Sequence, residues 1–469
     1  MTLLWLPVGI ALPTLSGWLL VRLCEGRHPV LLRLERWTLG FLLGVTATMF
    51  VTFLAHISGL VLFTRWGFLG VQIALTAALA ILRFLQWRLS HVHVRPASLP
   101  LSHPTRLWMV ILIAVLTLWT LVKITFGSFI LVSTPSYFDD SLKNWNYRAK
   151  VFAFTQTLDV DITENGGGDV LSSYPPTVSL FKTSLATLEG GWNGGLVNSI
   201  HILWFIAPLI LLYCALRHRT GWQWALLGTY LLASLPLYFF DGLNAYADVF
   251  LSGHLLAAGA ALTQGLTEHD AHRRQSWLRL FALIAGLLVF TKNEALVLYL
   301  PLLLAVLIGG LVFLRRQKKM TSREVWTTIA WTAGWLLAIG APWVLFKWTH
   351  GLAFGNAKAI TSSYSFGWQS GVLYVLWVNT FFEGNWHLLF PLLLLLLVLK
   401  RKYLLRSAVT PLALFVLAAL LLQISLFLFT SLSVEALKQT GLARGFVQLA
   451  PLVVLLTTLL AHEALQKRE

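Results

Sequence analysis

The sequence predicts an all-α protein that crosses a membrane many times. Hydrophobic residues make up 57% of the 469-residue chain and charged residues only 12%, whereas a soluble domain averages about 25% charged residues. The apolar residues fall in long runs, and a run of about 20 of them spans a bilayer as a helix. Only helices and closed barrels satisfy their backbone groups in lipid. Because the runs are continuous and do not alternate with polar residues, we predict helices.

The apolar runs give about thirteen spans by the length that a bilayer requires. The first run lacks a basic start and a small-residue cleavage site, so we expect it to be a retained span and not a removed signal peptide. The predicted spans cover residues 3–21, 37–63, 67–86, 107–131, 196–216, 222–240, 246–266, 277–291, 295–314, 326–348, 373–399, 408–430 and 446–462.

The charge distribution predicts which loops share a side of the membrane. If the first connecting loop is cytoplasmic, alternation puts every basic cluster on that side. That side then carries 24 Lys and Arg against 7 Asp and Glu, and the remainder carries 11 against 12. The formal charge of +16 therefore follows the positive-inside rule and does not indicate nucleic acid. We expect the N-terminus outside and the C-terminus in the cytoplasm.

The loops divide the chain into three expected units. Residues 1–106 form an N-terminal three-span extension, 107–314 a catalytic module that includes the long outer loop 132–195, and 315–469 a C-terminal module. Within the long loop, 142–154 and 177–188 have mixed apolar and polar faces, so we expect short helices along the membrane surface. A second outer loop covers 349–372, and its glycine, serine and aromatic content favours a mobile segment.

Ionisable residues stand at the outer ends of several predicted spans. They are Asp139-Asp140 after the fourth span, Asp248 at the start of the seventh, and Lys292 with Glu294 in the hairpin between the eighth and ninth. Charged side chains within the membrane are energetically costly and usually face protein or a water-filled cavity. Each has a structural interpretation, because Asp139 and Asp248 could cap helices and the hairpin pair could satisfy a turn. Their convergence on one face favours a functional site.

Further basic residues on the same side suit an anionic ligand. Arg444, at the outer end of the last span, could bind a phosphate through paired donors or extend to lipid headgroups. Arg148 and Lys150 follow the aspartate pair and have the same two interpretations. His387, beside Trp386, is better explained as an interfacial residue than as a metal ligand. The sequence contains no zinc-ligand spacing and no phosphate-cradling glycine loop, so a nucleotide-using domain is not expected.

Several short motifs resemble those of a known enzyme class. Phe138-Asp139-Asp140 through Lys150, Tyr174-Pro175-Pro176, Tyr246-Ala247-Asp248 and Thr291-Lys292-Asn293-Glu294 resemble the outer-loop motifs of bacterial superfamily C (GT-C) integral-membrane glycosyltransferases. These enzymes are related to protein O-mannosyltransferases and to the aminoarabinose transferase of lipid A. The resemblance covers about residues 107–300 by motif and the rest by hydropathy. The three spans before the catalytic loop depart from the simplest family layout.

The resemblance implies a function and roles for these residues. It implies transfer of a hexose or pentose from a polyprenyl-phosphate-linked donor to an envelope glycan, lipid or protein at the outer face of a bacterial inner membrane, with inversion. Asp139 or Asp140 would be the base that deprotonates the acceptor, with Asp139 favoured, and Asp248 a second acid that positions acceptor or donor. Lys292 and Arg444 would bind the donor phosphate, with Arg148 and Lys150 as further candidates. Glu294 and Tyr174 are other candidate site residues.

The residue types fit this chemistry independently of the resemblance. Glycosyl transfer needs a base near the attacking hydroxyl and positive charge on the departing phosphate. No cofactor is required, and a divalent metal is possible although no spacing demands one. The alternative function is a transporter or flippase of a lipid-linked sugar. A transporter is expected to show internal repeats and broken helices near the midplane, and the sequence shows no convincing repeat.

Overall fold

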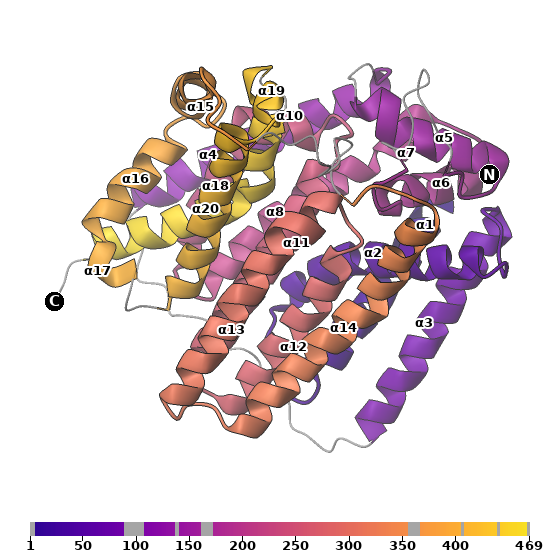
Figure 1. The fold of residues 1–469 in the computed structure, drawn as a ribbon, viewed down its shortest axis with the longest axis horizontal. Coiled ribbons are helices and arrows are strands. Elements are labelled where there is room, and N and C mark those ends of the chain that lie inside the picture. The colour runs from indigo at the N-terminus through magenta and orange to yellow at the C-terminus, as the bar shows by residue number, and fades with distance from the viewer. Residues whose placement is uncertain are drawn as a thin grey trace.

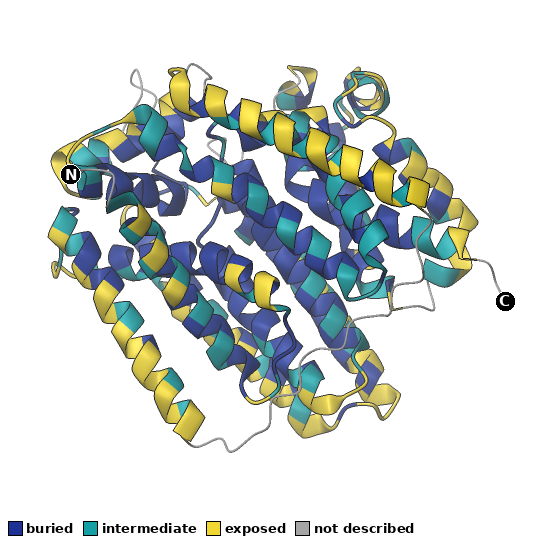
Figure 2. Cartoon of the chain, turned by 180° about the vertical axis from the view of Figure 1, so that it is seen from behind, coloured by how far each residue is buried: buried dark blue, intermediate teal, exposed yellow. Residues whose placement is uncertain are grey.

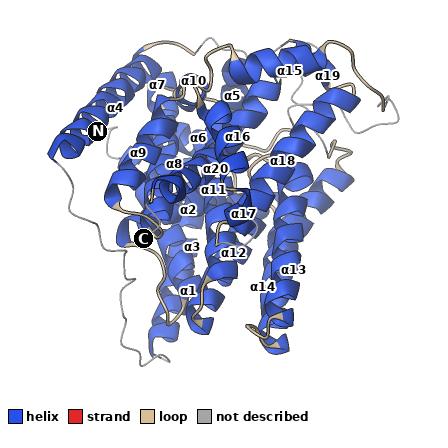
Figure 3. Cartoon of the chain, turned by 90° about the vertical axis from the view of Figure 1, so that its left-hand side faces the viewer, coloured by secondary structure: helices blue, strands red, loops and turns tan. Residues whose placement is uncertain are grey.

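The fold is a bundle of helices, as predicted. In this computed structural model the described residues are 5–88, 107–136, 140–160, 172–354, 366–404, 408–438 and 441–466. Within these ranges every regular element is a helix and none is a strand (Figures 1 and 3). Asp139, residues 355–365 of the second outer loop, and residues 161–171 of the long outer loop lie outside the described residues.

The first half of the chain supplies the predicted N-terminal spans and the helices of the long loop. The two segments expected to be short helices are helical, the first as a π-helical turn that continues into α5. The elements are α1 (Trp5–Glu25), α2 (Arg33–Ile57), α3 (Arg65–Arg88), α4 (Leu107–Ser133), η2 (Ser141–Trp145), α5 (Asn146–Thr155), α6 (Thr177–Glu189), α7 (Gly194–Asn198), α8 (Ile200–Arg217), α9 (Trp222–Ser234) and α10 (Pro236–Gly242).

The second half begins with the most buried helix of the bundle and ends with a long span. Its elements are α11 (Asp248–Thr267), α12 (Ala271–Leu288), η3 (Ala295–Tyr299), α13 (Leu300–Arg316), α14 (Ser322–Thr349), α15 (Val372–Phe381), α16 (Leu389–Leu399), α17 (Arg401–Leu404), α18 (Thr410–Phe429), α19 (Ser433–Leu437) and α20 (Gly441–Leu465).

Ten helical segments of the described chain are long and apolar enough to cross a membrane, and a bent pair makes up to eleven. The prediction of about thirteen spans therefore differs in number, although a helix lies in every predicted range. The range 373–399 holds two shorter apolar helices, α15 and α16, instead of one span. α12, which overlaps the predicted span 277–291, has Arg273 and Arg274 in its first turn and is not among these candidate spans.

The centre of the bundle is formed by α2, α11 and α20, whose apolar windows are more than four-fifths buried. α11 packs against α2, α8, α12, α13, α18 and α20, so its first residue is held inside the protein. Peripheral helices have long exposed faces (Figure 2), and those of α3 and α4 include many large apolar side chains, as expected where lipid replaces water. α6 is buried on nearly all sides, because α1, α2, α3 and α5 pack around it; it therefore does not rest on a surface with one free face.

One predicted span is broken. Residues 222–240 form α9 and α10, which meet at an angle of 74°. Pro236 is the first residue of α10, and a proline lacks the N–H that would continue the hydrogen bonds of α9. The carbonyl oxygen of Ser234 is freed by the break, and the ring nitrogen Nε2 of His387 lies 3.1 Å from it. His387, an exposed residue, therefore supports the helix break from the surface of the bundle.

The loops separate into two ends of the bundle. α5, α7, α10, α15 and α19 gather at one end, while the loop between α13 and α14 lies at the other (Figures 1 and 3). The first set belongs to the predicted outer side and the second to the predicted cytoplasmic side. The structure thus groups the loops as the charge pattern does. Which end faces the cytoplasm stays a prediction.

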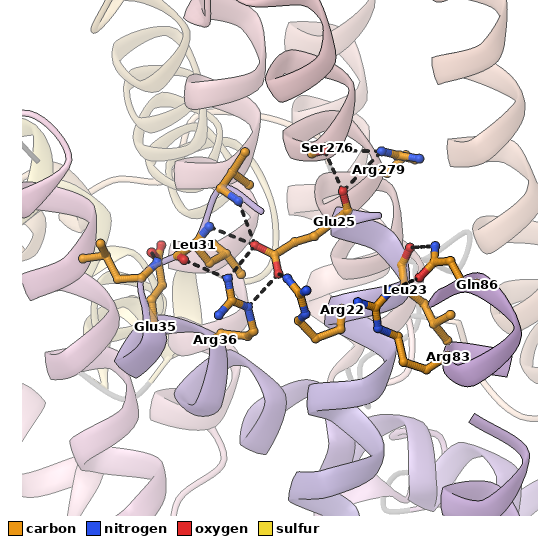
Figure 4. A network of polar contacts seen from close by, with 12 residues as sticks. Arg22, Leu23, Glu25, Leu31, Glu35, Arg36, Arg83, Gln86, Ser276 and Arg279 are labelled. Carbon is orange, nitrogen blue, oxygen red and sulfur yellow. Dashed lines mark hydrogen bonds and ion pairs between the residues drawn. The ribbon is translucent and has the colours of Figure 1, made fainter. Parts of the chain in front are cut away.

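A buried carboxylate organises the predicted cytoplasmic end (Figure 4). Glu25, at the end of α1, is completely buried and accepts hydrogen bonds from the backbone N–H groups of Val30 and Leu31. Arg36 donates to it from Nε at 2.6 Å and Arg22 from Nη1 at 3.1 Å. Ser276 of α12 donates to the Glu25 backbone carbonyl. The network joins the N-terminal spans to α12.

Candidate active site at one end of the bundle

Asp248 is the centre of a polar cluster at the predicted outer end. It is the first residue of α11, where the helix dipole favours a negative charge, and it is completely buried. Lys292 donates to Oδ1 at 2.7 Å, and Arg444 donates to Oδ2 from Nε and Nη2, each at 3.1 Å. Gln448 donates to Oδ1 at 2.5 Å. Four donor contacts therefore hold this carboxylate ionised and fixed.

The orientation of Gln448 is set by a second layer of side chains. Arg444 and Gln448 are four residues apart, so they share one face of α20. The hydroxyl of Tyr299, in η3, donates to Gln448 Oε1 at 2.7 Å. Gln423, in α18, donates to the Tyr299 oxygen at 2.5 Å. This chain of hydrogen bonds turns the amide N–H of Gln448 toward Asp248.

Arg444 connects the buried acid to a more accessible one. Its Nη1 lies 2.6 Å from Oδ2 of Asp140, while Nη2 contacts Asp248. The side chain of Asp140 is 32% exposed and that of Arg444 28%, whereas Asp248 is 0% exposed. The guanidinium also lies over the ring of Tyr246, 5.6 Å from its centroid. Asp140 and Arg444, together with Glu294, whose side chain is 25% exposed, are thus the members of the cluster that a substrate can reach.

Lys292 is placed between two carboxylates. Besides Asp248, it lies 3.2 Å from Oε1 of Glu294, and its side chain is 1% exposed. Burial lowers the pKa of Lys292, but the Asp248 and Glu294 carboxylates outweigh it and raise the pKa above its ordinary value. The lysine therefore stays charged despite its burial.

The Tyr174-Pro175-Pro176 motif packs beside the cluster. The Tyr174 ring lies 6.0 Å from Nζ of Lys292 and makes an edge contact with Trp145. Its backbone carbonyl accepts a hydrogen bond from Nη2 of Arg148 at 3.1 Å. Burial lowers the pKa of Arg148 to about 9. Arg148 holds the loop that carries Tyr174 and makes no ion pair with the acids of the cluster.

The predicted site residues are therefore partly assembled. Asp140, Asp248, Lys292, Glu294 and Arg444 form one ion-pair cluster, with Tyr174 against it. Lys150 lies apart, with its ammonium 5.3 Å from the ring centroid of Trp192. Asp139 is outside the described residues, so the choice between the two adjacent aspartates stays a prediction.

Both loops that carry the cluster continue into π-helical turns. Asp140 directly precedes η2, and Glu294 directly precedes η3. Such turns are rare and often accompany functional sites. The wider turn of η3 contains Tyr299, which supports Gln448. η2 has the mostly polar sequence Ser-Leu-Lys-Asn-Trp and η3 the apolar sequence Ala-Leu-Val-Leu-Tyr, so no shared sequence pattern signals this geometry.

Other polar residues of this region were not predicted. Asp241, in α10, is buried, and its Oδ2 has no hydrogen-bond partner among the described residues. Lys347, in α14, is buried and donates to Oδ1 of Asn293 at 3.0 Å and to the Ser173 carbonyl at 2.8 Å. Lys347 and Gln448 each stand in an apolar span, which was a signal available in the sequence.

The cluster has the groups that transfer of an activated sugar needs. It offers a partly exposed carboxylate, Asp140, that can accept a proton, and a partly exposed guanidinium, Arg444, that can contact an anion. Of the four cations predicted to bind the donor phosphate, Lys292 and Arg444 are already paired with carboxylates, so an incoming phosphate must compete for Arg444. Within the described residues, no group of three or more His, Cys, Asp or Glu side chains is arranged to hold a metal ion.

Comparison with known proteins gives a likeness of fold. No protein-family model and no curated protein matches the chain. Two solved structures of ArnT from Cupriavidus metallidurans do, one bound to undecaprenyl phosphate and one in the apo state. Each is 16% identical, with TM-scores of 0.53 and 0.51 over 74% and 75% of this chain. The match spans 60% and 59% of those proteins, so the chain is similar to ArnT in the fold of its membrane helices.

Proposed function

We propose that the protein transfers a sugar from a polyprenyl-phosphate-linked donor to an acceptor at one face of a bacterial inner membrane. The observation that carries this proposal is the placement of Asp140 and Asp248 on one arginine, beside Lys292, at one end of the bundle. The likeness in fold to ArnT, one of whose structures holds undecaprenyl phosphate, supports a polyprenyl phosphate as the lipid carrier. The motif resemblance supports sugar transfer with inversion.

In the proposed reaction, the first-loop acid is the base. Asp140, or its neighbour Asp139, accepts the proton of the acceptor hydroxyl while the hydroxyl oxygen attacks the anomeric carbon. The bond between that carbon and the phosphate oxygen breaks, and the polyprenyl phosphate leaves with the electron pair. Arg444 is in reach of the phosphate because its side chain is partly exposed. Asp248, fully buried, fixes Arg444 and Lys292 and makes no contact with substrate.

Variants of the two exposed members test this proposal. Three single variants are made: Asp140→Asn, Asp139→Asn and Arg444→Gln. Each is reconstituted in lipid nanodiscs and given radiolabelled polyprenyl phosphate sugars together with an extract of the cell envelope. Loss of a positioned base costs about 10²–10⁴-fold in rate, so at least one aspartate variant loses turnover while still binding polyprenyl phosphate. Asp159→Asn is the matched control, since Asp159 belongs to the same loop but to none of the ion pairs above.

The outcomes separate the assigned roles from the reaction class. If both aspartate variants transfer sugar at the wild-type rate, the base is assigned wrongly. If the wild-type protein binds no polyprenyl phosphate and transfers no sugar, the transferase proposal fails.

A flippase of lipid-linked sugars is the second candidate, and the break between α9 and α10 favours it. Discontinuous helices are typical of transporter substrate sites. A flippase moves a fluorescent polyprenyl phosphate sugar across a vesicle membrane without forming a new glycoside. Translocation by wild type and Asp140→Asn alike, with no glycoside in either, would favour this candidate over the transferase.

A further inference from the structure

A pocket beside the cluster has no assigned role in the proposed reaction. It has a volume of about 560 Å³ and lies between α4, the α9–α10 break and the turn that carries His387. Ligand pockets usually have volumes of about 300–1,000 Å³. Lys123, Gly127 and Leu131, at helical spacing on α4, form one wall, and Phe239 and Leu243 belong to the other.

Gly127 keeps the two walls close. A Cβ atom at this position would lie 2.5 Å from the Leu243 side chain and 2.8 Å from that of Phe239, so a larger residue would push α4 away from α10. The pocket follows α4 from Lys123 to Thr134, which is about 16 Å of helix. Its shape is therefore long, and its walls are mostly apolar.

The pocket lies on the lipid side of the bundle. α4 is the least buried of the candidate spans, with 6% of its apolar window inside the protein. Phe126 and Phe129, on its other face, are 65% and 68% exposed. In a membrane these rings contact lipid. The helix that separates the pocket from the bilayer is thus itself surrounded by hydrocarbon, and an apolar occupant can arrive from there.

The polar end of the pocket is next to the proposed base. Ser136 and Asn244 line that end. The hydroxyl of Ser141 donates to the backbone carbonyl of Asn244 at 2.5 Å, and Asp140 is the residue before Ser141. A molecule whose chain fills the pocket therefore places its polar group beside the Asp140 loop.

We propose that this pocket holds the hydrocarbon part of the acceptor, so that the acceptor is a membrane lipid whose hydroxyl reaches Asp140 from the α4 side. The inference rests on the proposed function. A hydroxyl suits the neutral polar end formed by Ser136 and Asn244. Asp140, Lys292 and Arg444 all lie outside the pocket lining, so the pocket holds the chain of the acceptor and only its polar group extends past Ser136 and Asn244 toward Asp140.

The charged residue in the lining lies at the other end of the pocket. The Lys123 ammonium is over the Phe239 ring, 4.7 Å from its centroid, a contact that offsets part of the cost of desolvating it. Its distance along α4 from Ser136 keeps it away from the reacting hydroxyl. Lys123 therefore contacts the deep part of the bound lipid and takes no part in the transfer.

Filling the pocket tests its role. Leu131→Trp places an indole in the pocket, and Phe129→Trp makes the same change on the lipid-facing side of α4. Each variant is reconstituted in nanodiscs and given a polyprenyl phosphate sugar and a total lipid extract of the cell envelope. We expect Leu131→Trp to raise the KM for the lipid extract at least tenfold, with unchanged binding of polyprenyl phosphate, and Phe129→Trp to behave as wild type.

Two results of this assay would overturn the inference. One is weaker binding of polyprenyl phosphate by Leu131→Trp with a normal KM for the lipid extract, since the pocket would then hold the donor chain. The other is no change in either quantity while the variant remains folded, as judged by size-exclusion chromatography.

A crosslinking measurement keeps the inference testable even if the transferase proposal fails. A photoreactive benzoylphenylalanine is introduced at Ile130, which lines the pocket, and at Phe129 as the control. After irradiation of intact membranes, mass spectrometry identifies the adducts. A hydroxyl-bearing lipid attached at Ile130, and enriched over Phe129, supports the inference. A polyprenyl phosphate at Ile130, or the same bulk lipids at both positions, refutes it.

Discussion

Substituting Asp248 by asparagine separates the buried acid that builds the cluster from the exposed acid proposed to react. Asp248 is 0% exposed and balances Lys292, itself 1% exposed, and one edge of Arg444. Asparagine keeps the shape but removes the charge. Among the described carboxylates, Lys292 then keeps Glu294, 3.2 Å away and 25% exposed, so a buried ammonium loses its main partner.

The expected cost follows from this burial. Removing one partner of a buried ion pair costs about 3–5 kcal/mol, and because Glu294 remains, we expect the lower end, about 3 kcal/mol. The Asp140–Arg444 pair is about a third exposed on both sides, and water screens such pairs to about 1 kcal/mol or less. Asp248→Asn should therefore destabilise the protein by at least about 2 kcal/mol more than Asp140→Asn.

Chemical unfolding in detergent, followed by intrinsic tryptophan fluorescence, measures this difference. The double variant Asp248→Asn/Lys292→Met removes the orphaned ammonium as well, and should recover part of the loss that Asp248→Asn alone causes. Equal stability of Asp248→Asn and wild type would refute the reasoning, because a fully buried pair would then contribute nothing. If the double variant is less stable than both Asp248→Asn and Lys292→Met, the loss of stability in Asp248→Asn is not caused by the unpaired charge of Lys292.

The remaining predictions concern activity, pH and topology. At least one of Asp140→Asn and Asp139→Asn should lose about 10²–10⁴-fold in transfer rate at normal membrane abundance, measured by radiolabelled sugar incorporation; a wild-type rate in both variants contradicts the base assignment. Burial lowers the pKa of Lys182 from 10.5 to about 7. Between these two pH values the unfolded chain therefore binds more protons than the folded protein, and the free energy of unfolding rises with pH. This rise should be smaller in Lys182→Met. A reporter active only outside the cytoplasm should be silent after Glu469 and active near Gly167, and the reverse pattern would overturn the topology.

The sequence predicted the fold class and most of the ion-pair cluster for one physical reason. A membrane span tolerates few charges, so the positions of Asp248, Lys292 and Arg444 at span ends were conspicuous against apolar surroundings. Alternating topology then placed them on one side. Their mutual pairing follows, because charges buried at one end of a helix bundle must find partners there.

The features that were not predicted depend on packing between distant segments. The break at Pro236 is held by His387, about 150 residues further along, and a proline alone also occurs inside unbroken spans such as α14. The orientation of Gln448 requires Tyr299 and Gln423 from two other helices. The roles proposed for Asp140 and Asp248 rest on the different exposure of the two side chains, which no local pattern in the sequence reports.

The network around Glu25 has a consequence for how the chain is inserted into a membrane during synthesis. The charges that balance this carboxylate, Arg22 and Arg36, lie within eleven residues of it along the chain, so the acid can be neutralised as soon as the first helical hairpin has left the ribosome. The hydrogen bond from Ser276 to the backbone carbonyl of Glu25 forms later, because Ser276 lies 251 residues further along the chain. The N-terminal hairpin can therefore be inserted in the bilayer with the charge of Glu25 already neutralised, and α12 packs against it later.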